Sequence, residues 1–230
     1  RMSQTLGGIS SMATGQVLAD PAAAYQQRSG RAVAIESVGG VDAARRVAAG
    51  EAFDVVFLAS DAIDKLVAAR HALADSRVDL VRSEVAVAVR RGSPHPDLSS
   101  EQAVRQAVLA APTIGYSTGP SGTALLQLFE RWGIAQQVRE RTVQAPPGVP
   151  VGSLVAKGEV ALGFQQRSEL THLDGIDVLG ALPEPIRITT IFSGAVCTAS
   201  GQREAVRGLL DFMASAAVDD LKRRHGMDPA

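Results

Sequence analysis

The sequence predicts an α/β protein built as two lobes, and two features of the chain lead to that prediction. Apolar runs typical of buried strands alternate with helical patterns of about 10 to 15 residues, which favours parallel α/β layering. Two runs, Leu80–Val89 and Ile186–Cys197, are longer than ordinary strands and could cross between lobes. We therefore expect a first lobe to begin in residues 1–83, a second lobe in 84–186, and a hinge return with C-terminal helices that complete lobe 1 in 187–230. A single doubly wound domain is the alternative.

The first half of the chain contains a strand followed by a helix. Phe53–Ala59 is apolar enough for a buried strand, and Ser60 is the expected N-cap of the helix that follows. An earlier helical pattern contains Pro21, so that helix is predicted to be kinked or to start there. Between them, Val33–Ile35 is expected to be a strand that ends near Glu36.

The second half of the chain repeats this plan. Ile114–Tyr116 precedes a Gly-rich turn and a helical pattern over residues 124–132, and Gly133 is the expected helix stop. The remaining expected elements are strands at 160–164 and 176–179 and helices at 204–213 and 218–225.

The composition narrows the class of protein. With 46% hydrophobic and 20% charged residues, the chain can bury a sizeable core, and 23 Lys and Arg against 24 Asp and Glu predict no nucleic-acid partner. No run of roughly 18 apolar residues occurs, so no membrane insertion is expected. The start of the chain lacks the apolar stretch of a signal peptide, and Met2-Ser3 resembles a native start after a leftover Arg1. The lone Cys197 forbids an intramolecular disulfide, and neither a cofactor nor a metal site is expected.

Small residues gather at four junctions where strands are expected to end and helices to begin. These junctions are residues 7–14, 37–41, 117–123 and 146–153. Ligands of open α/β sheets bind at the carboxyl ends of strands, and a helix start offers unpaired N–H groups and the positive end of its dipole. Converging helix starts therefore predict an anion site that needs no Lys or Arg. Ordinary helix capping is the alternative at any single junction.

Several segments together resemble one known family. They are Gly50–Asp61, the early Ser10-Ser11, the Gly-Pro-Ser-Gly loop at 119–122, and the order of elements over roughly residues 5–226. The chain resembles the molybdate-binding periplasmic proteins, a branch of the type II solute-binding proteins of ABC transporters. The resemblance implies a two-lobed type II periplasmic-binding-protein fold with a two-strand hinge. It also implies a monomer in the periplasm that closes on a small oxyanion held by neutral donors and delivers it to an ABC permease, although the missing signal peptide leaves a cytoplasmic location open.

Matched by position, the resemblance nominates Ser10 or Ser11, Gly39 and Gly40, and Val151 as ligand-binding residues. Two departures from the family pattern concern the ligand. Gly39-Gly40 stands where the family usually has serines, so hydroxyl donors are lost. Gln165-Gln166 stands where molybdate binders commonly place a tyrosine, and a glutamine side chain both donates and accepts hydrogen bonds. The ligand is therefore expected to be either an oxyanion or a small carboxylic acid.

The expected site is a cleft between the lobes that closes around the anion. Its expected ligand-binding residues are Ser10, Ser11, Gly39, Gly40, Ser117, Thr118, Ser121, Gly122, Val151 and Gln165. Arg82 and Arg187, both near the expected hinge, are the cations that could reach an acid.

An enzyme is the second hypothesis, because some relatives of this fold branch are isomerases of small unsaturated acids, aconitate isomerases among them. Moving an allylic proton requires a general base within hydrogen-bond reach. Glu36 is the acid nearest a junction, although a capping role would also explain it. The four histidines, His71, His95, His172 and His225, are expected to be solvated in surface turns and helix ends. A ligand-sensing regulatory domain is a third class, but no helix-turn-helix segment accompanies these residues.

Overall fold

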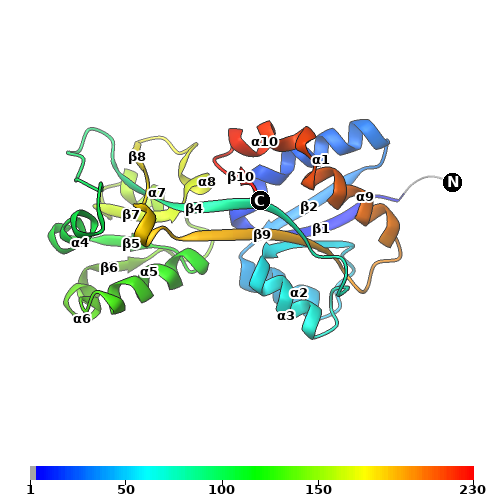
Figure 1. The fold of residues 1–230 in the computed structure, drawn as a ribbon, viewed down its shortest axis with the longest axis horizontal. Helices are drawn as coiled ribbons and strands as arrows, with labels where there is room; N and C mark the ends of the chain where they lie inside the picture. Colours follow the sequence, from blue (N-terminus) through cyan, green and yellow to red (C-terminus); the bar gives the residue numbers. More distant parts are fainter. Residues whose placement is uncertain (1–3) are drawn as a thin grey trace. The chain divides into compact units, whose positions relative to one another are not determined.

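The computed structural model describes residues 4–230, so Met2 and Ser3 lie outside the described residues. The chain divides into two compact units (Figure 1). Unit 1 comprises the chain up to Ser83 together with Ile191–Ala230, and unit 2 is Glu84–Thr190. Strands β4 (Val78–Arg90) and β9 (Thr189–Val196) carry the chain from one unit to the other.

The chain returns to unit 1 at Ile191, whereas the sequence analysis placed this return at Arg187. A backbone hydrogen bond explains the later position. The Val85 N–H donates to the carbonyl oxygen of Ile188 over 3.0 Å, which ties this stretch of the chain to unit 2.

The sheet of unit 1 has the strand order β2-β1-β3-β9-β4, and β10 (Asp228–Pro229) pairs with β4. Strands β1, β2 and β3 run parallel, while β9 is antiparallel to β3. The bounds of the three parallel strands are Leu6–Ser11, Val33–Val38 and Val55–Ala59.

Gly7 and Gly8 lie inside β1, although the sequence analysis assigned them to the first junction. The neighbouring strands explain this difference. A Cβ at position 8 would lie 2.9 Å from Val55 Cγ1 and 3.3 Å from Ile35 Cγ1, so the two flanking strands fit closely around a glycine. A glycine in this run therefore indicates close packing rather than a turn.

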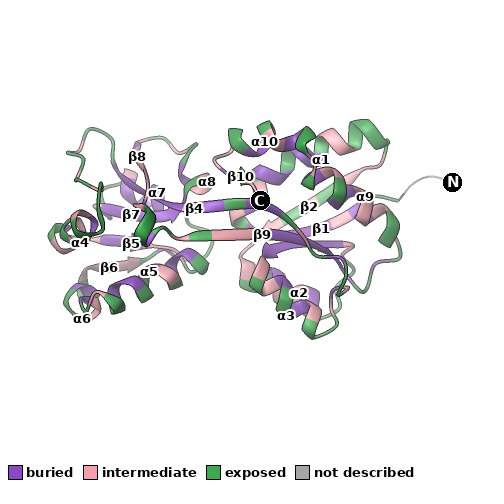
Figure 2. Cartoon of the chain, in the orientation of Figure 1, coloured by how far each residue is buried: buried purple, intermediate pink, exposed green. Residues whose placement is uncertain are grey.

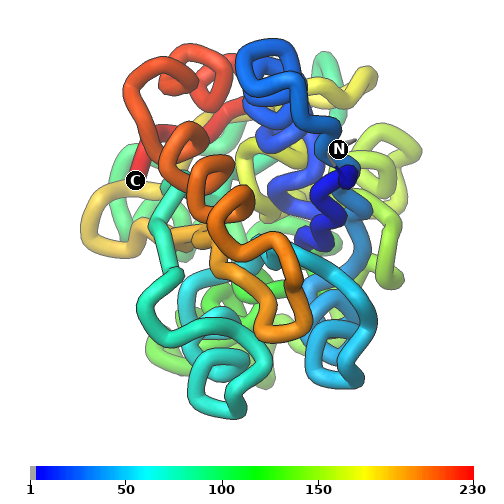
Figure 3. Tube along the Cα trace, turned by 90° about the vertical axis from the view of Figure 1, so that its right-hand side faces the viewer, coloured from blue at the N-terminus to red at the C-terminus, as the bar shows by residue number. Residues whose placement is uncertain are grey.

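Helices cover both faces of the unit 1 sheet. Helices α1 and α9 bury Leu18, Leu209 and Met213 against one face, and α2 and α3 bury Val47 and Ile63 against the other. Figure 3 shows α1 in blue and α10 in red above, with the cyan α2 and α3 below. The bounds are Met12–Thr14 for η1, Gly15–Ser29 for α1, Gly40–Ala48 for α2, Ser60–Ala68 for α3, Arg203–Ala214 for α9, Ala216–Val218 for η4 and Asp219–Arg224 for α10.

The structure contradicts a helix start at Pro21 and an N-cap at Ser60. Helix α1 begins at Gly15 and includes Pro21 in its interior, so the proline does not start the helix. Pro21 itself is buried with Leu18 and Ala22, and this apolar face offsets the one hydrogen bond that proline cannot donate. The N-cap of α3 is Ala59 rather than Ser60, which is the first helical residue and makes no capping hydrogen bond.

The sheet of unit 2 has the strand order β4-β7-β5-β6, and β8 (Ile176–Ala181) pairs with β4. Strands β5, β6 and β7 run parallel, and β4 is antiparallel to β7. The bounds of the parallel strands are Ile114–Tyr116, Thr142–Gln144 and Leu162–Gln166. Every residue of β7 is buried, as the purple strand in Figure 2 shows.

Helices also cover both faces of the unit 2 sheet. Helices α4 and α5 pack with Val85, Val87 and Val89 of β4, while α7 and α8 pack with the alternate residues Ala86 and Ala88. This alternation reflects the two-residue period of a strand. The bounds are Glu101–Ala110 for α4, Pro120–Arg131 for α5, Ala135–Val138 for α6, Arg139–Arg141 for η2, Val151–Ala156 for α7, Arg167–Leu170 for α8 and Glu184–Ile186 for η3.

Within residues 4–230, no helix combines the length and the apolar character needed to span a bilayer.

Candidate functional site

The carboxyl ends of the parallel strands define one edge of the sheet in unit 1. Strands β1, β2 and β3 end at Ser11, Val38 and Ala59, and a helix begins after each of them. Parallel strands end at the same edge, so the starts of η1, α2 and α3 gather there. This edge presents several helix N-termini, where backbone N–H groups favour an anion.

The hydroxyl groups at the unit 1 edge already make hydrogen bonds with one another. Ser10 is fully buried, and its Oγ lies 2.8 Å from Ser37 Oγ and donates to the Ser11 carbonyl oxygen over 3.0 Å. Ser11 Oγ lies 3.4 Å from Thr14 Oγ1. Ser11, 8% exposed, is therefore better placed than Ser10 to offer its hydroxyl to a ligand.

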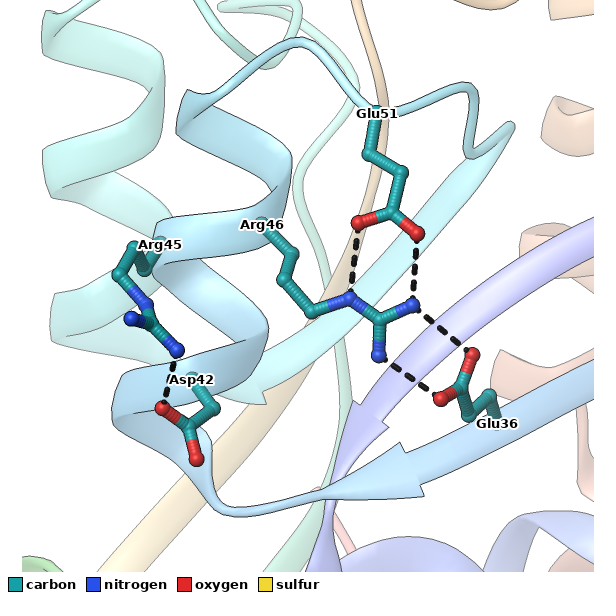
Figure 4. Close-up of polar contacts among 5 residues, drawn as sticks. All are labelled: Glu36, Asp42, Arg45, Arg46 and Glu51. Carbon is teal, nitrogen blue, oxygen red and sulfur yellow. Dashed lines mark hydrogen bonds and ion pairs between the residues drawn. The ribbon is translucent and has the colours of Figure 1, made fainter.

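The first two expected junctions lie close together at Gly40. A Cβ at position 40 would lie 3.7 Å from Ser11 Cβ, so the start of α2 contacts the end of β1. Gly39 is the N-cap of α2, and its nearest side chain is that of Asp42, whose carboxylate pairs with Arg45 at 2.8 Å (Figure 4). This junction offers backbone N–H groups and no hydroxyl of its own at positions 39 and 40.

Glu36 is a poor general base in this structure. Arg46 donates two hydrogen bonds to its carboxylate, at 2.7 and 3.1 Å, and two more to Glu51, at 2.8 and 2.6 Å (Figure 4). The hydrogen bonds from Arg46 hold the pKa of Glu36 below its usual value. A carboxylate that is exposed, paired and held in its ionised form has little tendency to take up a proton near neutral pH.

A similar edge exists in unit 2, where β5, β6 and β7 end at Tyr116, Gln144 and Gln166. Because these strands are parallel, the starts of α5, α7 and α8 follow at one edge of the sheet. Val151, the first residue of α7, packs over glycines of two strands: its Cγ1 would lie 3.1 Å from a Cβ at Gly115 and 3.0 Å from one at Gly163. The two glycines allow the start of α7 to lie close against the sheet.

The loop after β5 is held by its own hydroxyl groups. Ser117 Oγ lies 2.9 Å from Ser121 Oγ, and Ser121 is only 3% exposed. Gly122 is buried beneath the carbonyl oxygen of Ser117, whereas Thr118 is exposed. Ser117, Thr118, Ser121 and Gly122 therefore do lie together in unit 2, as their sequence positions suggested.

The backbone N–H of Val151, a residue that the family resemblance assigns to the ligand, is already hydrogen bonded to Gln165. The Val151 N–H donates to Gln165 Oε1 over 2.9 Å, in a buried position. Gln165 itself is 4% exposed. The Val151 N–H is therefore already occupied by the amide of Gln165.

Glu169 is a candidate functional residue that the sequence analysis missed. It lies on α8, four positions after Gln165, and burial raises its pKa to about 7, while a hydrogen bond from Gln165 acts in the opposite direction. Strongly raised carboxyl pKa values are more frequent at functional sites than elsewhere. The spacing of Gln165 and Glu169 was visible in the sequence, but it does not show that packing would remove the carboxyl group from water.

The histidines and arginines do not supply an obvious cation for an acid. His225 was expected to be solvated, but its Nε2 lies 2.9 Å from Asp20 Oδ2 and its side chain is 17% exposed. Helix α10 packs against α1, which brings the two residues together. Arg82 lies 3.9 Å from Asp228, and the Arg187 Nε donates to the Leu182 carbonyl oxygen at 3.2 Å. Both arginines are thus engaged within their own units.

Across residues 4–230, no group of three or more His, Cys, Asp and Glu side chains is arranged to hold a metal ion.

The fold is that of the type II periplasmic binding proteins, which confirms the predicted fold. The chain belongs to the family described as bacterial extracellular solute-binding protein, whose model matches residues 8–228. The periplasmic molybdate-binding protein of Azotobacter vinelandii has a similar structure, with a TM-score of 0.79 at 19% identity over 96% of this chain and 98% of that chain. The sulfate-binding protein SubI of Mycobacterium tuberculosis H37Rv also has a TM-score of 0.79, at 17% identity over 99% and 87% of the two chains. These structures establish the fold.

A relative with higher identity carries the name of an enzyme. The aconitate isomerase of a Pseudomonas species is 40% identical over 185 residues, which are 80% of this chain and 70% of that protein.

Proposed function

We propose that this protein binds a small organic carboxylate at the carboxyl ends of parallel strands, where helices begin. The observation that carries the proposal is the buried Gln165, whose amide stands at the end of β7 and accepts the Val151 N–H. A glutamine amide can donate to a carboxylate and accept from a hydroxyl, which suits an organic acid. The similarity to an aconitate isomerase supports the same class of ligand.

The hydroxyl groups favour a carboxylate over a tetrahedral oxyanion. Positions 39 and 40 are glycines, and Ser10 is committed to Ser37. Few side-chain hydroxyls therefore remain in unit 1 to surround a metal oxyanion. Within each unit, the helix starts supply neutral backbone donors, which stabilise a carboxylate without an ion pair.

The family suggests the setting in which this binding would operate. Bacterial extracellular solute-binding proteins act outside the cytoplasm, and we propose that this chain delivers its ligand there to an ABC permease as a monomer.

Isomerisation of a small unsaturated acid is the second candidate function. Two observations favour it: the 40% identity to an aconitate isomerase, and the raised pKa of Glu169 beside Gln165. Binding and turnover require the same class of ligand, so the identity of the ligand is the first question to answer.

A thermal-shift panel tests the ligand class. It would compare molybdate, tungstate and sulfate with citrate, cis-aconitate, trans-aconitate and succinate. A ligand at 100 times its dissociation constant adds about 2.7 kcal/mol, which raises the melting temperature by roughly 5 to 10 °C in a chain of this size. We expect a di- or tricarboxylate to give the largest shift. A shift with oxyanions alone would refute the carboxylate assignment.

A further inference from the structure

We propose that Glu169, which lies beside Gln165 at the carboxyl end of β7, is the general base that removes and returns a proton on a bound unsaturated carboxylic acid. The inference rests on the proposed function, because it requires that such an acid occupies the unit 2 edge. It assigns the chemical step to a residue on α8 rather than to Glu36 in unit 1.

A chain of hydrogen bonds fixes the groups around Glu169. The Val151 N–H donates to Gln165 Oε1 at 2.9 Å, which leaves the amide nitrogen of Gln165 to donate to the Glu169 carboxylate. Gln165 is 4% exposed and its strand is fully buried, so this amide has little freedom to turn. The carboxyl group is therefore held in one place at the edge where α5, α7 and α8 begin.

The proton affinity of Glu169 suits a group that must both accept and release a proton. Burial raises the pKa of its carboxyl to about 7, and the hydrogen bond from Gln165 only partly opposes this rise. A base is most effective when its pKa lies near the working pH, because it is then ionised often enough to accept a proton and acidic enough to return it. Glu36 has the opposite character, with its pKa lowered by Arg46.

The elements in closest contact with α8 contribute few ionisable side chains among the described residues. Helix α8 contacts α7, β7 and β8. Helix α7 and strand β7 contain no ionisable side chain, and β8 contains only Asp177, which pairs with His95 at 3.2 Å and accepts the Gly92 N–H. Arg167 on α8 itself is exposed. Burial, rather than a neighbouring charge, therefore sets the protonation of Glu169.

The proposed reaction is balanced without a cofactor. In aconitate, Glu169 would take a proton from the methylene carbon, and the electrons of that C–H bond would form a double bond to the central carbon. The proton on the Glu169 carboxyl exchanges with water, and the original double bond then supplies the electrons that accept a proton from Glu169 at the former vinyl carbon. The double bond has then moved by one position, the carboxylate of Glu169 is restored, and either geometry can form. Neutral donors at the helix starts would stabilise the charge that develops on the substrate carboxylates.

Proton NMR in D₂O tests this assignment directly. The purified chain would be incubated with trans-aconitate, and both the appearance of cis-aconitate and the deuteration of the methylene carbon would be followed. We expect Glu169→Gln to slow both by about 10² to 10⁴-fold, as is typical for loss of a general base, while calorimetry shows retained binding. The matched control, Glu36→Gln, should keep wild-type rates. Wild-type turnover should rise with pH through about 7, because only the ionised carboxylate accepts a proton.

Each outcome tests either the role of Glu169 as a base or the proposed binding of a carboxylate. Wild-type rates in a folded Glu169→Gln variant, or a wild-type rate that is constant between about pH 6 and 8, would overturn the role of Glu169. Binding of trans-aconitate by the wild type without deuteration would also overturn it, but would leave the proposed binding function intact. Absence of any carboxylate binding in calorimetry would refute the proposed function itself. Should Glu169→Gln fail to fold, the wild-type pH profile still decides the question.

Discussion

Gly122 lies directly beneath the carbonyl oxygen of Ser117, so closely that a Cβ at position 122 would overlap that oxygen. The contact joins the first turn of α5 to the start of the loop after β5. It holds the hydroxyl pair of Ser117 and Ser121 at the sheet edge, because neither segment can move away from the other without opening the turn.

Replacement of Gly122 by alanine should therefore damage both stability and ligand binding. Overpacking against backbone typically costs about 1 to 3 kcal/mol, and the loop must shift to make room. Gly119→Ala is the matched control, because its Cβ would lie 3.9 Å from Ser117 Oγ, an ordinary contact. Urea unfolding and calorimetry would measure the two effects. Equal behaviour of the two variants would show that the contact does not organise this edge.

A second prediction concerns Gly40. Gly40→Ser should fold normally, because the nearest side chain to a Cβ there is Ser11 at 3.7 Å and the position is helical. The new hydroxyl adds a donor at the unit 1 edge, and one hydrogen bond to a charged group is worth about 1.5 to 3 kcal/mol. We expect molybdate affinity to rise by roughly tenfold or more relative to the wild type. Unchanged molybdate affinity, measured by calorimetry, would argue against a ligand at this edge.

Local patterns were sufficient to predict many elements of the fold. The apolar run at 53–59 and the periodic segment at 124–132 correspond to β3 and α5, because each element buries a face whose spacing is visible in the sequence. The positions of Gly7 and Gly8 could not be predicted from local patterns. Their place inside β1 depends on Val55 and Ile35 of neighbouring strands, which are distant in the chain.

One part of the candidate site could be predicted from the sequence and another part could not. The cluster of Ser117, Ser121 and Gly122 could be predicted because a single turn contains it. The environments of Glu36 and Glu169 could not, because they depend on other elements: Arg46 on α2 pairs with Glu36, while packing around α8 partly buries Glu169. Sequence adjacency to a junction therefore did not reveal the hydrogen bonds and burial of these two carboxyl groups.

Glu169 should make the stability of the protein depend on pH. Its pKa in the folded state, about 7, lies above the ordinary value of 4.5, so between these pH values the folded protein binds more protons than the unfolded chain. The stabilisation is complete below about pH 4.5 and is lost as pH rises through 7, a difference of roughly 3 kcal/mol at most. Urea unfolding at several pH values should show this decline in the wild type and a weaker one in Glu169→Gln. Identical pH profiles would contradict the burial of this carboxyl.

Glu36→Gln should have little effect on either stability or ligand binding. The Glu36 carboxylate is exposed, and Arg46 retains two hydrogen bonds to Glu51 after the change. Exposed ion pairs contribute little to folding, since solvent screens them. A thermal melt and a calorimetric titration would check both expectations, and a marked loss of ligand affinity would restore Glu36 as a site residue.

The central claim is that the protein binds a small carboxylate, and titration calorimetry of the wild type with trans-aconitate and with molybdate tests it most directly. Ser100→Ala provides a control, because Ser100 only caps α4 through the Ala103 N–H and its loss should cost about 1 kcal/mol of stability without altering binding. We predict saturable binding of trans-aconitate and much weaker binding of molybdate. Submicromolar molybdate binding together with no detectable heat from trans-aconitate would contradict the account.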